Sequence, residues 1–447
     1  MSSDYLALAD EMAAQIRDGA LKIGERLPPQ RQFAWSRNIA VSTASRVYGE
    51  LLRRGLVVGE VGRGTFVAGE NPRNITAATV EPRGSRIDLE LNFSILPSQA
   101  ALMAKALEGL VRADALQATL PQSASIGTAR VRQLAAQFLA VDGWTPRPGQ
   151  LVFTGNGRQS IAAVLAALVP PGGRCGVEAI TYPFIKGTAS RLGITLVPLA
   201  MDEHGVRPDA VQKAHREGRL SAIYVQPVIH NPLGMTMPPQ RRAELLRVVE
   251  KLDLVVVEDF IYGFLDEVPP LAAEAPERCV VIDSLSKRIA PGLSLGFIVS
   301  PQHLREDIMA AVRAGGWMAQ GFAFAAAERF MSDGTAREIA GLKREDAKVR
   351  QEIAAEMLKG FQLQTNPRSY HVWLVLPEQW RSQAFVAAAA RHDIALTPSS
   401  AFSVNPGHAP NAIRLALAQP PHDQLREALG TLAHILKGSD TDGYFTE

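Results

Sequence analysis

Three polar residues with complementary chemistry stand at regular positions in the centre of the chain. Lys287 ends the segment 279–287, which begins with a run of apolar residues. Asp259 ends a second apolar run and Asn231 follows a third, and each is 28 positions from the next. This interval is the length of a strand–helix–strand repeat, so we expect all three at the carboxyl ends of successive strands. Open α/β sheets bind ligands at that edge.

The chemistry of these side chains, together with that of Tyr262, is what pyridoxal 5′-phosphate requires. Lys287 would form an imine with the cofactor's aldehyde, and Asp259 would pair with its protonated pyridine nitrogen. Asn231 and Tyr262 would hydrogen-bond the phenolic oxygen of the ring. Taken singly, each residue also has an ordinary interpretation as a strand end, a helix cap or a turn. Their order and spacing favour the cofactor site.

The turn between a short strand (151–154) and an apolar helix (161–169) is rich in glycine. Glycine lets the backbone approach an anion, and the first turn of a helix offers free amide donors. We therefore expect this turn to bind the phosphate, although an ordinary turn is the competing interpretation. Its candidate cofactor-binding residues are Gly155, Asn156 and Gly157.

Two further residues complete the predicted ligand site. Tyr182 follows another short apolar segment and precedes Pro183, so it is a candidate for stacking on the pyridine ring, with a plain loop as the alternative. Arg414 stands among apolar residues in a predicted strand, where an arginine requires an anionic partner. That partner is either a structural carboxylate or a bound anion.

Residues 88–437 resemble the fold type I pyridoxal-phosphate aminotransferases. The resemblance rests on motifs in a fixed order: Gly155-Asn156-Gly157, Tyr182-Pro183, Asn231-Pro232-Leu233-Gly234, Asp259-x-x-Tyr262 and Ser284-x-Ser286-Lys287. It implies an α/β body with the cofactor contacts described above. It further implies that Ser284 and Ser286 help to hold the phosphate, and that Arg414 clamps the α-carboxylate of an amino-acid ligand.

One departure from this pattern concerns the phosphate. Fold type I proteins usually carry a phosphate-clamping arginine seven residues after the lysine, and Ser294 occupies that position here. Arg288, directly after Lys287, is the candidate substitute and is included among the predicted cofactor-binding residues. The alternative is that Arg288 points away, since neighbours on an extended segment normally face opposite sides.

The first 70 residues predict a separate winged helix-turn-helix domain. Apolar residues recur at helical spacing over 5–16, and a second short helix is expected over 30–35 after two prolines. A third helix is expected to begin near Ser42, with that serine as its cap. Two short strands, 56–58 and 65–67, would form the wing.

Positive charge is concentrated in one part of this domain. Residues 26–67 hold seven arginines against two glutamates, a net charge of +5, whereas residues 1–25 carry −3. Such confinement is typical of a DNA-binding surface, and a small protein-binding winged helix is the alternative. Hydroxyl and guanidinium groups on the third helix suit phosphates and base edges in a major groove. The candidate DNA-binding residues are Arg31, Ser42, Thr43, Ser45, Arg46 and Arg63.

The domain resembles the GntR type of DNA-binding domain, most specifically in Gly24-x-Arg26-Leu27-Pro28-Pro29-Gln30-Arg31 and Gly62-Arg63-Gly64-Thr65-Phe66-Val67. A GntR-like head on an aminotransferase-like body resembles the MocR family of bacterial transcriptional regulators. The resemblance implies a homodimer that binds double-stranded operator DNA and pyridoxal 5′-phosphate, and that senses an amine or amino-acid effector. The implied divisions are a head (1–70), a linker (71–87), a body (88–437) and a flexible tail (438–447).

Composition narrows the class of protein. The net charge of +2 is close to neutral, so the DNA prediction rests on local charge. Cys175 and Cys279 lack the spacing of metal ligands or of a disulfide framework. Because no apolar run approaches the ~18 residues of a membrane span and the N-terminus lacks signal-peptide character, we expect a cytoplasmic protein.

Three functions remain open on the sequence. The first is a regulator that uses the cofactor for sensing and is not an enzyme beyond weak transaminase chemistry. The second is a working aminotransferase with a regulatory head, and the third is a DNA-binding protein whose body serves only for dimerisation. A borohydride-reducible absorbance band separates the third from the others, and steady turnover separates the second.

Overall fold

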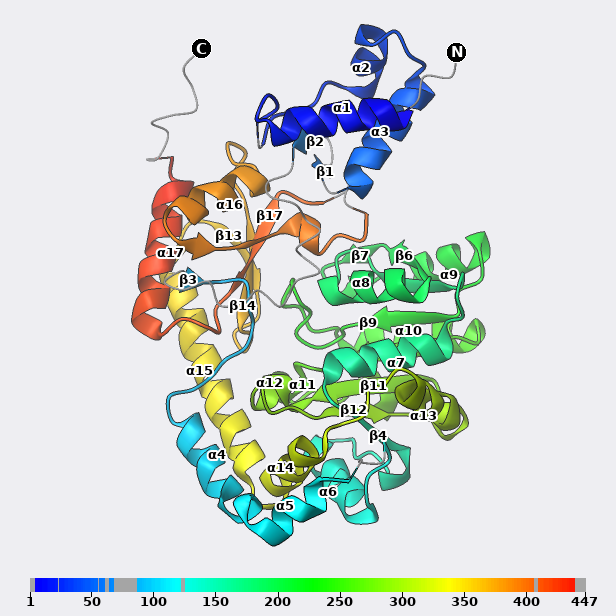
Figure 1. Ribbon diagram of the computed structural model, residues 1–447, viewed down its shortest axis with the longest axis vertical. Coiled ribbons are helices and arrows are strands. Elements are labelled where there is room, and N and C mark those ends of the chain that lie inside the picture. Colours follow the sequence, from blue (N-terminus) through cyan, green and yellow to red (C-terminus); the bar gives the residue numbers. More distant parts are fainter. Residues whose placement is uncertain are drawn as a thin grey trace. The chain divides into compact units, whose positions relative to one another are not determined.

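The computed structural model describes residues 5–22, 24–54, 56–60, 64–67, 87–121, 125–405 and 409–438 (Figure 1). The chain divides into two compact units. One unit comprises Met1–Leu91, Ile353–Gln364 and Val372–Glu447, and the other comprises Asn92–Glu352 and Thr365–His371. No helix within these described ranges is long and apolar enough to cross a membrane.

The N-terminal part of the first unit is a winged helix-turn-helix. Its elements are α1 (Tyr5–Arg17), α2 (Gln30–Ser36), α3 (Val41–Arg53), β1 (Val57–Glu60) and β2 (Gly64–Val67). The apolar face of α3 packs against α1 and α2, with Val47 and Leu51 fully buried. The two strands pair antiparallel, with Val57 opposite Val67. The predicted three helices and hairpin are therefore confirmed.

One detail of this domain was predicted wrongly. The cap of α3 is Ala40, which has an extended backbone, and Ser42 lies inside the first helical turn. Since the helix begins at Val41, the Ser42 side chain is exposed and is not its cap.

The remainder of the first unit contains a four-stranded sheet in the order β13-β14-β17-β16. Its strands are β13 (Gln362–Thr365), β14 (His371–Val375), β16 (Thr397–Pro398) and β17 (Ala412–Ala416). A two-stranded parallel ladder joins β3 (Ile87–Asp88) to β15 (Ile394–Ala395). Leu374 and Leu415 from the sheet share one buried core with Leu429. Its helices are α16 (Ser382–Arg391), η6 (Ser399–Ala401) and α17 (His422–Leu436).

A seven-stranded sheet forms the centre of the second unit, in the order β4-β12-β11-β10-β9-β5-β6. Its pairs are parallel except those made by β12, which is antiparallel to both neighbours. The strands are β4 (Leu151–Thr154), β5 (Arg174–Glu178), β6 (Thr195–Leu199), β9 (Ala222–Val225), β10 (Val255–Asp259), β11 (Cys279–Ser284) and β12 (Gly296–Val299). Such a sheet is buried on both faces, which explains its nearly continuous apolar strands.

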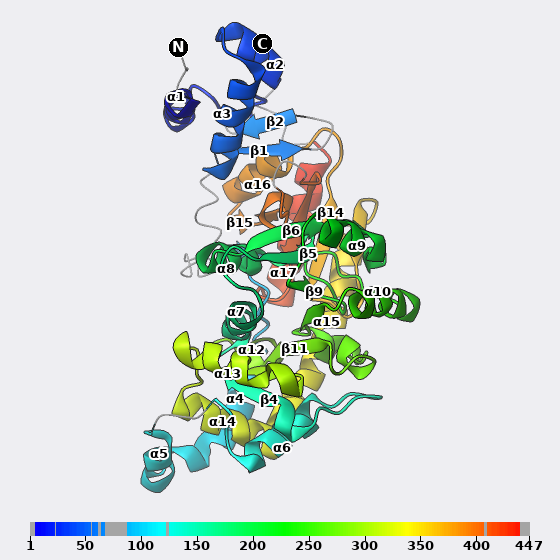
Figure 2. The same cartoon turned by 90° about the vertical axis from the view of Figure 1, so that its right-hand side faces the viewer.

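Helices cover this sheet on both faces: Figure 2 shows α7 (Gly157–Leu168) and α8 (Pro183–Leu192) on one side, and α9 (Pro208–Glu217) and α10 (Pro239–Lys251) on the other. The further helices are α4 (Gln99–Leu107), η2 (Glu108–Val111), α5 (Ala113–Thr119), α6 (Ala129–Leu139), η3 (Pro148–Gln150), η5 (Gln302–Leu304), α13 (Arg305–Ala314), α14 (Gly321–Ser332) and α15 (Thr335–Met357).

Only one of the two 28-residue intervals is a full strand–helix–strand repeat. Helix α10 connects β9 to β10, as predicted. Between β10 and β11 the described chain has only α11 (Gly263–Asp266) and η4 (Leu271–Ala273), so that part of the prediction was wrong. Proline at 269 and 270 accounts for the difference, because it disfavours continuation of a helix.

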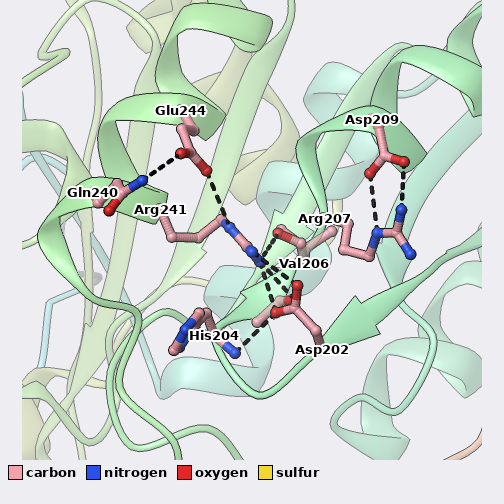
Figure 3. A network of polar contacts seen from close by, with 9 residues as sticks. Asp202, His204, Val206, Arg207, Asp209, Gln240, Arg241 and Glu244 are labelled. Atoms are coloured by element: carbon pink, nitrogen blue, oxygen red, sulfur yellow. Dashed lines mark hydrogen bonds and ion pairs between the residues drawn. The ribbon is translucent and has the colours of Figure 1, made fainter.

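A polar network fixes the small hairpin β7 (Met201–Asp202) and β8 (Gly205–Val206) to α10 (Figure 3). Arg241 donates to both carboxylate oxygens of Asp202, each at 2.8 Å. This pairing lowers the pKa of Asp202. Bidentate arginine–carboxylate contacts favour one orientation of both groups, so the network orients the hairpin.

Candidate functional site

One pocket of the second unit collects most of the predicted site residues. It lies at the carboxyl ends of β9 and β10, next to the first turn of α7 and the short helix α12 (Leu285–Arg288). Its lining residues are Phe93, Gly157, Arg158, Ile161, Tyr182, Gln226, Asn231, Asp259, Ile261, Tyr262, Ser286 and Lys287. Seven of the predicted cofactor-binding residues are among them: Gly157, Tyr182, Asn231, Asp259, Tyr262, Ser286 and Lys287.

Asp259 ends β10 and is the buried carboxyl group of the pocket. It accepts a hydrogen bond from the Tyr224 hydroxyl at 2.5 Å and a longer one from the Ile261 amide at 3.3 Å. Burial raises the pKa of Asp259 to about 6, and the Tyr224 hydrogen bond opposes that rise. A carboxyl group with this pKa is mostly ionised at neutral pH and can pair with a cationic ring nitrogen.

Gln226 connects Asp259 to Asn231. Its side-chain amide nitrogen donates to the Tyr224 hydroxyl at 3.0 Å and to Asp259 at 3.4 Å. Its side-chain oxygen accepts from the backbone amide of Asn231 at 2.9 Å. One glutamine therefore sets the positions of both predicted ligand-contacting residues.

Asn231 and Tyr262 have the polar groups expected near a phenolic oxygen. The Asn231 Oδ1 atom is buried and has no hydrogen-bond partner in the described part of the chain. The Tyr262 hydroxyl accepts from Asn92 at 2.9 Å. A buried amide oxygen with unmet capacity is costly unless a ligand or water meets it. The donor and acceptor set of the pocket thus fits pyridoxal 5′-phosphate.

Lys287 lies in α12 and not at the end of a strand, because β11 ends at Ser284. Its Nζ donates to the Asn92 carbonyl at 2.6 Å and lies 3.3 Å from the centroid of the Phe93 ring. The buried side chain of Lys343 holds this segment from the other side. Its Nζ donates to the carbonyl oxygens of Lys287, Ile289 and Ser94, at 3.0, 2.5 and 2.7 Å.

The other end of the pocket is formed by the first turn of α7. Asn156 caps this helix by accepting from the Gln159 amide at 3.0 Å. A Cβ atom at Gly157 would come within 3.2 Å of the Ser284 Cβ atom, so glycine permits the close approach of α7 to α12. Helix N-termini attract anions, which suits a phosphate group at this end.

Four predicted cofactor-binding residues have other positions in the structure. Gly155 and Asn156 shape and cap the turn, and they do not line the pocket. Ser284 caps α12 by accepting from the Ser286 amide at 3.1 Å, and its hydroxyl also contacts that of Ser294 at 3.0 Å. Gly155, Asn156 and Ser284 therefore position α7 and α12.

The fourth, Arg288, requires a correction. It forms a buried ion pair with Asp283, to which its Nε donates at 3.1 Å. Its guanidinium lies 5.1 and 5.3 Å from the ring centroids of Phe138 and Phe264. Because adjacent side chains on α12 diverge, Arg288 enters the protein core while Lys287 enters the pocket. The interpretation of Arg288 as a cofactor-binding residue was therefore wrong.

Arg414 belongs to the first unit, where it is buried in β17 as predicted. It donates to the Glu90 carbonyl and, at 3.1 Å, to the Thr397 hydroxyl. Its guanidinium lies 5.2 Å from the centroid of the Phe402 ring.

Most of the candidate DNA-binding residues lie on the surface of the head. Arg31, Ser42, Ser45 and Arg46 are exposed and Thr43 is partly exposed. The Arg46 guanidinium lies 4.0 Å from the centroid of the Tyr5 ring on α1, a distance typical of a cation–π contact. Arg63 lies outside the described residues.

Several residues that line the pocket or contact Lys287 had no predicted role. Phe93 and Asn92 stand in a segment without periodicity, and no sequence signal indicates their contact with Lys287. Gln226 directly follows the apolar strand β9, in the same kind of position as Asp259, and that signal could have found it. Arg158 follows Gly157 in the phosphate turn and was equally accessible to sequence reasoning.

Comparison with known protein families agrees with both parts of the chain. Residues 88–432, more than half of its length, match the family Aminotransferase class I and II. The chain belongs to this family. Residues 4–67 match Bacterial regulatory proteins, gntR family, so a gntR-type DNA-binding head precedes the aminotransferase-like body. This is the MocR-type combination that the sequence motifs predicted.

Individual relatives include proteins named as transcriptional regulators and proteins named as aminotransferases. The chain is 27% identical over 437 residues to the uncharacterized HTH-type transcriptional regulator YdeF of Bacillus subtilis, covering 97% of this chain and 94% of that protein. It is 26% identical over 305 residues to the HTH-type pyridoxine biosynthesis transcriptional regulator PdxR of Corynebacterium glutamicum, and the match covers 66% of this chain and 65% of that protein. An archaeal alanine:glyoxylate aminotransferase superposes with a TM-score of 0.73 at 20% identity, covering 82% of this chain and 94% of that one. The body thus has the predicted fold of the fold type I aminotransferases.

Proposed function

We propose that the protein is a transcriptional regulator whose aminotransferase-like body binds pyridoxal 5′-phosphate at Lys287 and senses an amine or amino acid. The observation that carries the proposal is the convergence of Asn231, Asp259, Tyr262 and Lys287 in one pocket of a chain with a gntR-type head. Pyridoxal 5′-phosphate, when bound, supplies an aldehyde that reacts reversibly with amines. Such reactivity suits recognition of an amino-group effector.

Each pocket residue has a distinct part in this proposal. The ionised Asp259 holds the ring nitrogen in its protonated form, and Tyr224 keeps that carboxylate in place. Asn231 and Tyr262 would orient the ring through its phenolic oxygen, and Tyr182 would cover one face of the ring. The Lys287 amine would provide the covalent link, and the Phe93 ring, whose centroid lies 3.3 Å from Nζ, would help to position it.

Arg414 is proposed to bind the carboxylate of an amino-acid effector. Its hydrogen bonds to Glu90 and Thr397 hold the guanidinium in one orientation, which favours recognition of a planar carboxylate.

The name of the relative PdxR, which refers to pyridoxine biosynthesis, is consistent with a vitamin B6 compound as the ligand of the body.

We further propose that the head spans residues 1–70, the linker 71–87, the body 88–437 and the tail 438–447, with the protein acting as a homodimer on operator DNA. Residues 71–86 of the linker and 439–447 of the tail lie outside the described residues. Exposed Arg31, Ser45 and Arg46 support a DNA contact by α2 and α3. A second candidate function is weak aminotransferase activity, because the pocket retains both the lysine and the ring-pairing carboxylate.

The proposal is tested by absorbance spectroscopy and DNA binding on the same preparation. With pyridoxal 5′-phosphate, the full chain should give an absorbance band at the edge of the visible range that borohydride reduction shifts. Lys287→Ala should no longer retain the cofactor covalently after reduction. An exposed lysine variant, Lys213→Ala, provides the control. Full-length protein should bind DNA from the region upstream of its own gene, and a candidate amine should change both the band and the affinity for DNA. Covalent retention by Lys287→Ala would contradict the assignment of the lysine.

A further inference from the structure

The phosphate group of the proposed cofactor carries negative charge that the pocket must compensate. Among the described residues that line the pocket, the cations are Lys287 and Arg158. Lys287 is assigned to the aldehyde, and formation of that link uses its amine. Arg288 is paired with Asp283 in the core, and Ser294 contributes only a hydroxyl that contacts Ser284. Arg158 is the cation that remains within the pocket.

The position of Arg158 fits this task. It is the second residue of α7, so its charge adds to the anion-attracting end of a 12-residue helix. Its Nε donates to the Tyr182 hydroxyl at 3.1 Å, and its guanidinium lies 5.3 Å from the centroid of the Phe184 ring. These two contacts hold a long side chain in one place, which reduces the entropy lost when it binds an anion.

We propose that Arg158 supplies the positive charge that holds the phosphate group of pyridoxal 5′-phosphate, with Tyr182 as a positioning residue for its guanidinium. This inference rests on the proposed function. The phosphate site then consists of the first turn of α7, the Arg158 guanidinium and the Ser286 hydroxyl. Arg158 in α7 thus replaces the phosphate-binding arginine that fold type I proteins usually carry at the position of Ser294.

The test compares two ligands that differ only in the phosphate group, pyridoxal 5′-phosphate and pyridoxal. Equilibrium binding of each is measured by absorbance for the full chain and for Arg158→Gln. The variant should bind pyridoxal 5′-phosphate about 10- to 100-fold more weakly, as expected for loss of a charge-assisted hydrogen bond. Its affinity for pyridoxal should stay within about twofold of the unchanged chain, so the preference for the phosphorylated ligand collapses.

Three further variants complete the design. Arg158→Lys keeps the charge and should recover part of the preference for pyridoxal 5′-phosphate over pyridoxal. Tyr182→Phe should lower that preference by a smaller factor than Arg158→Gln does. Arg207→Gln removes an exposed arginine that pairs with Asp209 on the surface and should change neither affinity. Thermal unfolding of each variant without ligand verifies that it folds.

The outcomes separate this inference from the proposed function. If the unchanged chain binds neither ligand, the cofactor assignment fails and this inference fails with it. If the unchanged chain binds pyridoxal 5′-phosphate but Arg158→Gln keeps its preference, only the role of Arg158 is refuted. Equal losses for both ligands in Arg158→Gln also overturn the inference, because they indicate a general disturbance of the pocket.

Discussion

Replacing Asp259 by asparagine should stabilise the cofactor-free protein while weakening its hold on the cofactor. Burial raises the pKa of this carboxyl group from 3.8 to about 6. The folded protein therefore binds the proton more tightly than the unfolded chain, and ionisation of Asp259 costs stability. The cost is absent below about pH 4, grows as the pH rises to about 6, and is complete above that value.

The two pKa values set the magnitude of each effect. The cost is about 3 kcal/mol at pH 7 and about half of that at pH 5. Asp259→Asn removes it but weakens the hydrogen bond from Tyr224, which offsets about 1 kcal/mol. The net gain in free energy of unfolding should be about 2 kcal/mol at pH 7 and under about 1 kcal/mol at pH 5. Loss of the pairing with the ring nitrogen should weaken cofactor binding about 10- to 100-fold.

Denaturant unfolding of the cofactor-free protein at both pH values, followed by titration with pyridoxal 5′-phosphate, measures these quantities. Asp209→Asn is the matched control, because Asp209 is an exposed carboxylate that pairs with Arg207. The reasoning is refuted if Asp259→Asn is less stable than the unchanged chain at pH 7. It is equally refuted if the variant binds the cofactor as tightly as before.

Three other outcomes follow from the described contacts. Lys343→Met should lower the free energy of unfolding by at least about 2 kcal/mol in denaturant titrations, because three buried carbonyl oxygens each lose a donor, although that of Ile289 keeps another, the Gln99 side chain. A change below about 0.5 kcal/mol would mean that the ammonium is not their main partner. Arg31→Ala should weaken binding to all DNA sequences alike and lower the salt slope by about one unit, and an unchanged slope would place Arg31 away from the phosphates. Arg46→Ala should relax specificity at one base pair at a cost of about 1–3 kcal/mol, whereas a uniform loss on all sequences would make it a phosphate contact.

The sequence predicted the parts of the site that depend on strand order. Asn231 and Asp259 could be placed because the carboxyl ends of parallel strands meet at one edge of a sheet. Side-chain direction within a short helix was not accessible in this way, so Arg288 was assigned to the pocket although it pairs with Asp283. Contacts between distant segments, such as that of Asn92 with Lys287, leave no local pattern in a single sequence.

The exact start of α3 was also missed, for a different reason. Both Ala40 and Ser42 are compatible with a helix that begins near residue 41, and serine has the stronger intrinsic preference for the cap position. In the structure α3 begins at Val41 with Ala40 as its cap, while Ala44, Val47 and Leu51 pack in the core of the head. The intrinsic preference for serine at the cap position therefore does not fix the first residue of this helix.

The side chain of Gln226 has a consequence for how the pocket distinguishes the two edges of a flat ring. Its nitrogen faces Asp259 and Tyr224, and its oxygen faces the Asn231 amide. Rotating that amide by half a turn would place an oxygen against a carboxylate and a nitrogen against a backbone donor, so both neighbours oppose it. The two edges of the pocket therefore differ: in the proposed function Asp259 would accept a cationic N–H at one edge, and Asn231 and Tyr262 would meet an oxygen at the other. A ring bound in the reverse orientation would place its phenolic oxygen against the Asp259 carboxylate and its nitrogen beside the neutral side chains of Asn231 and Tyr262.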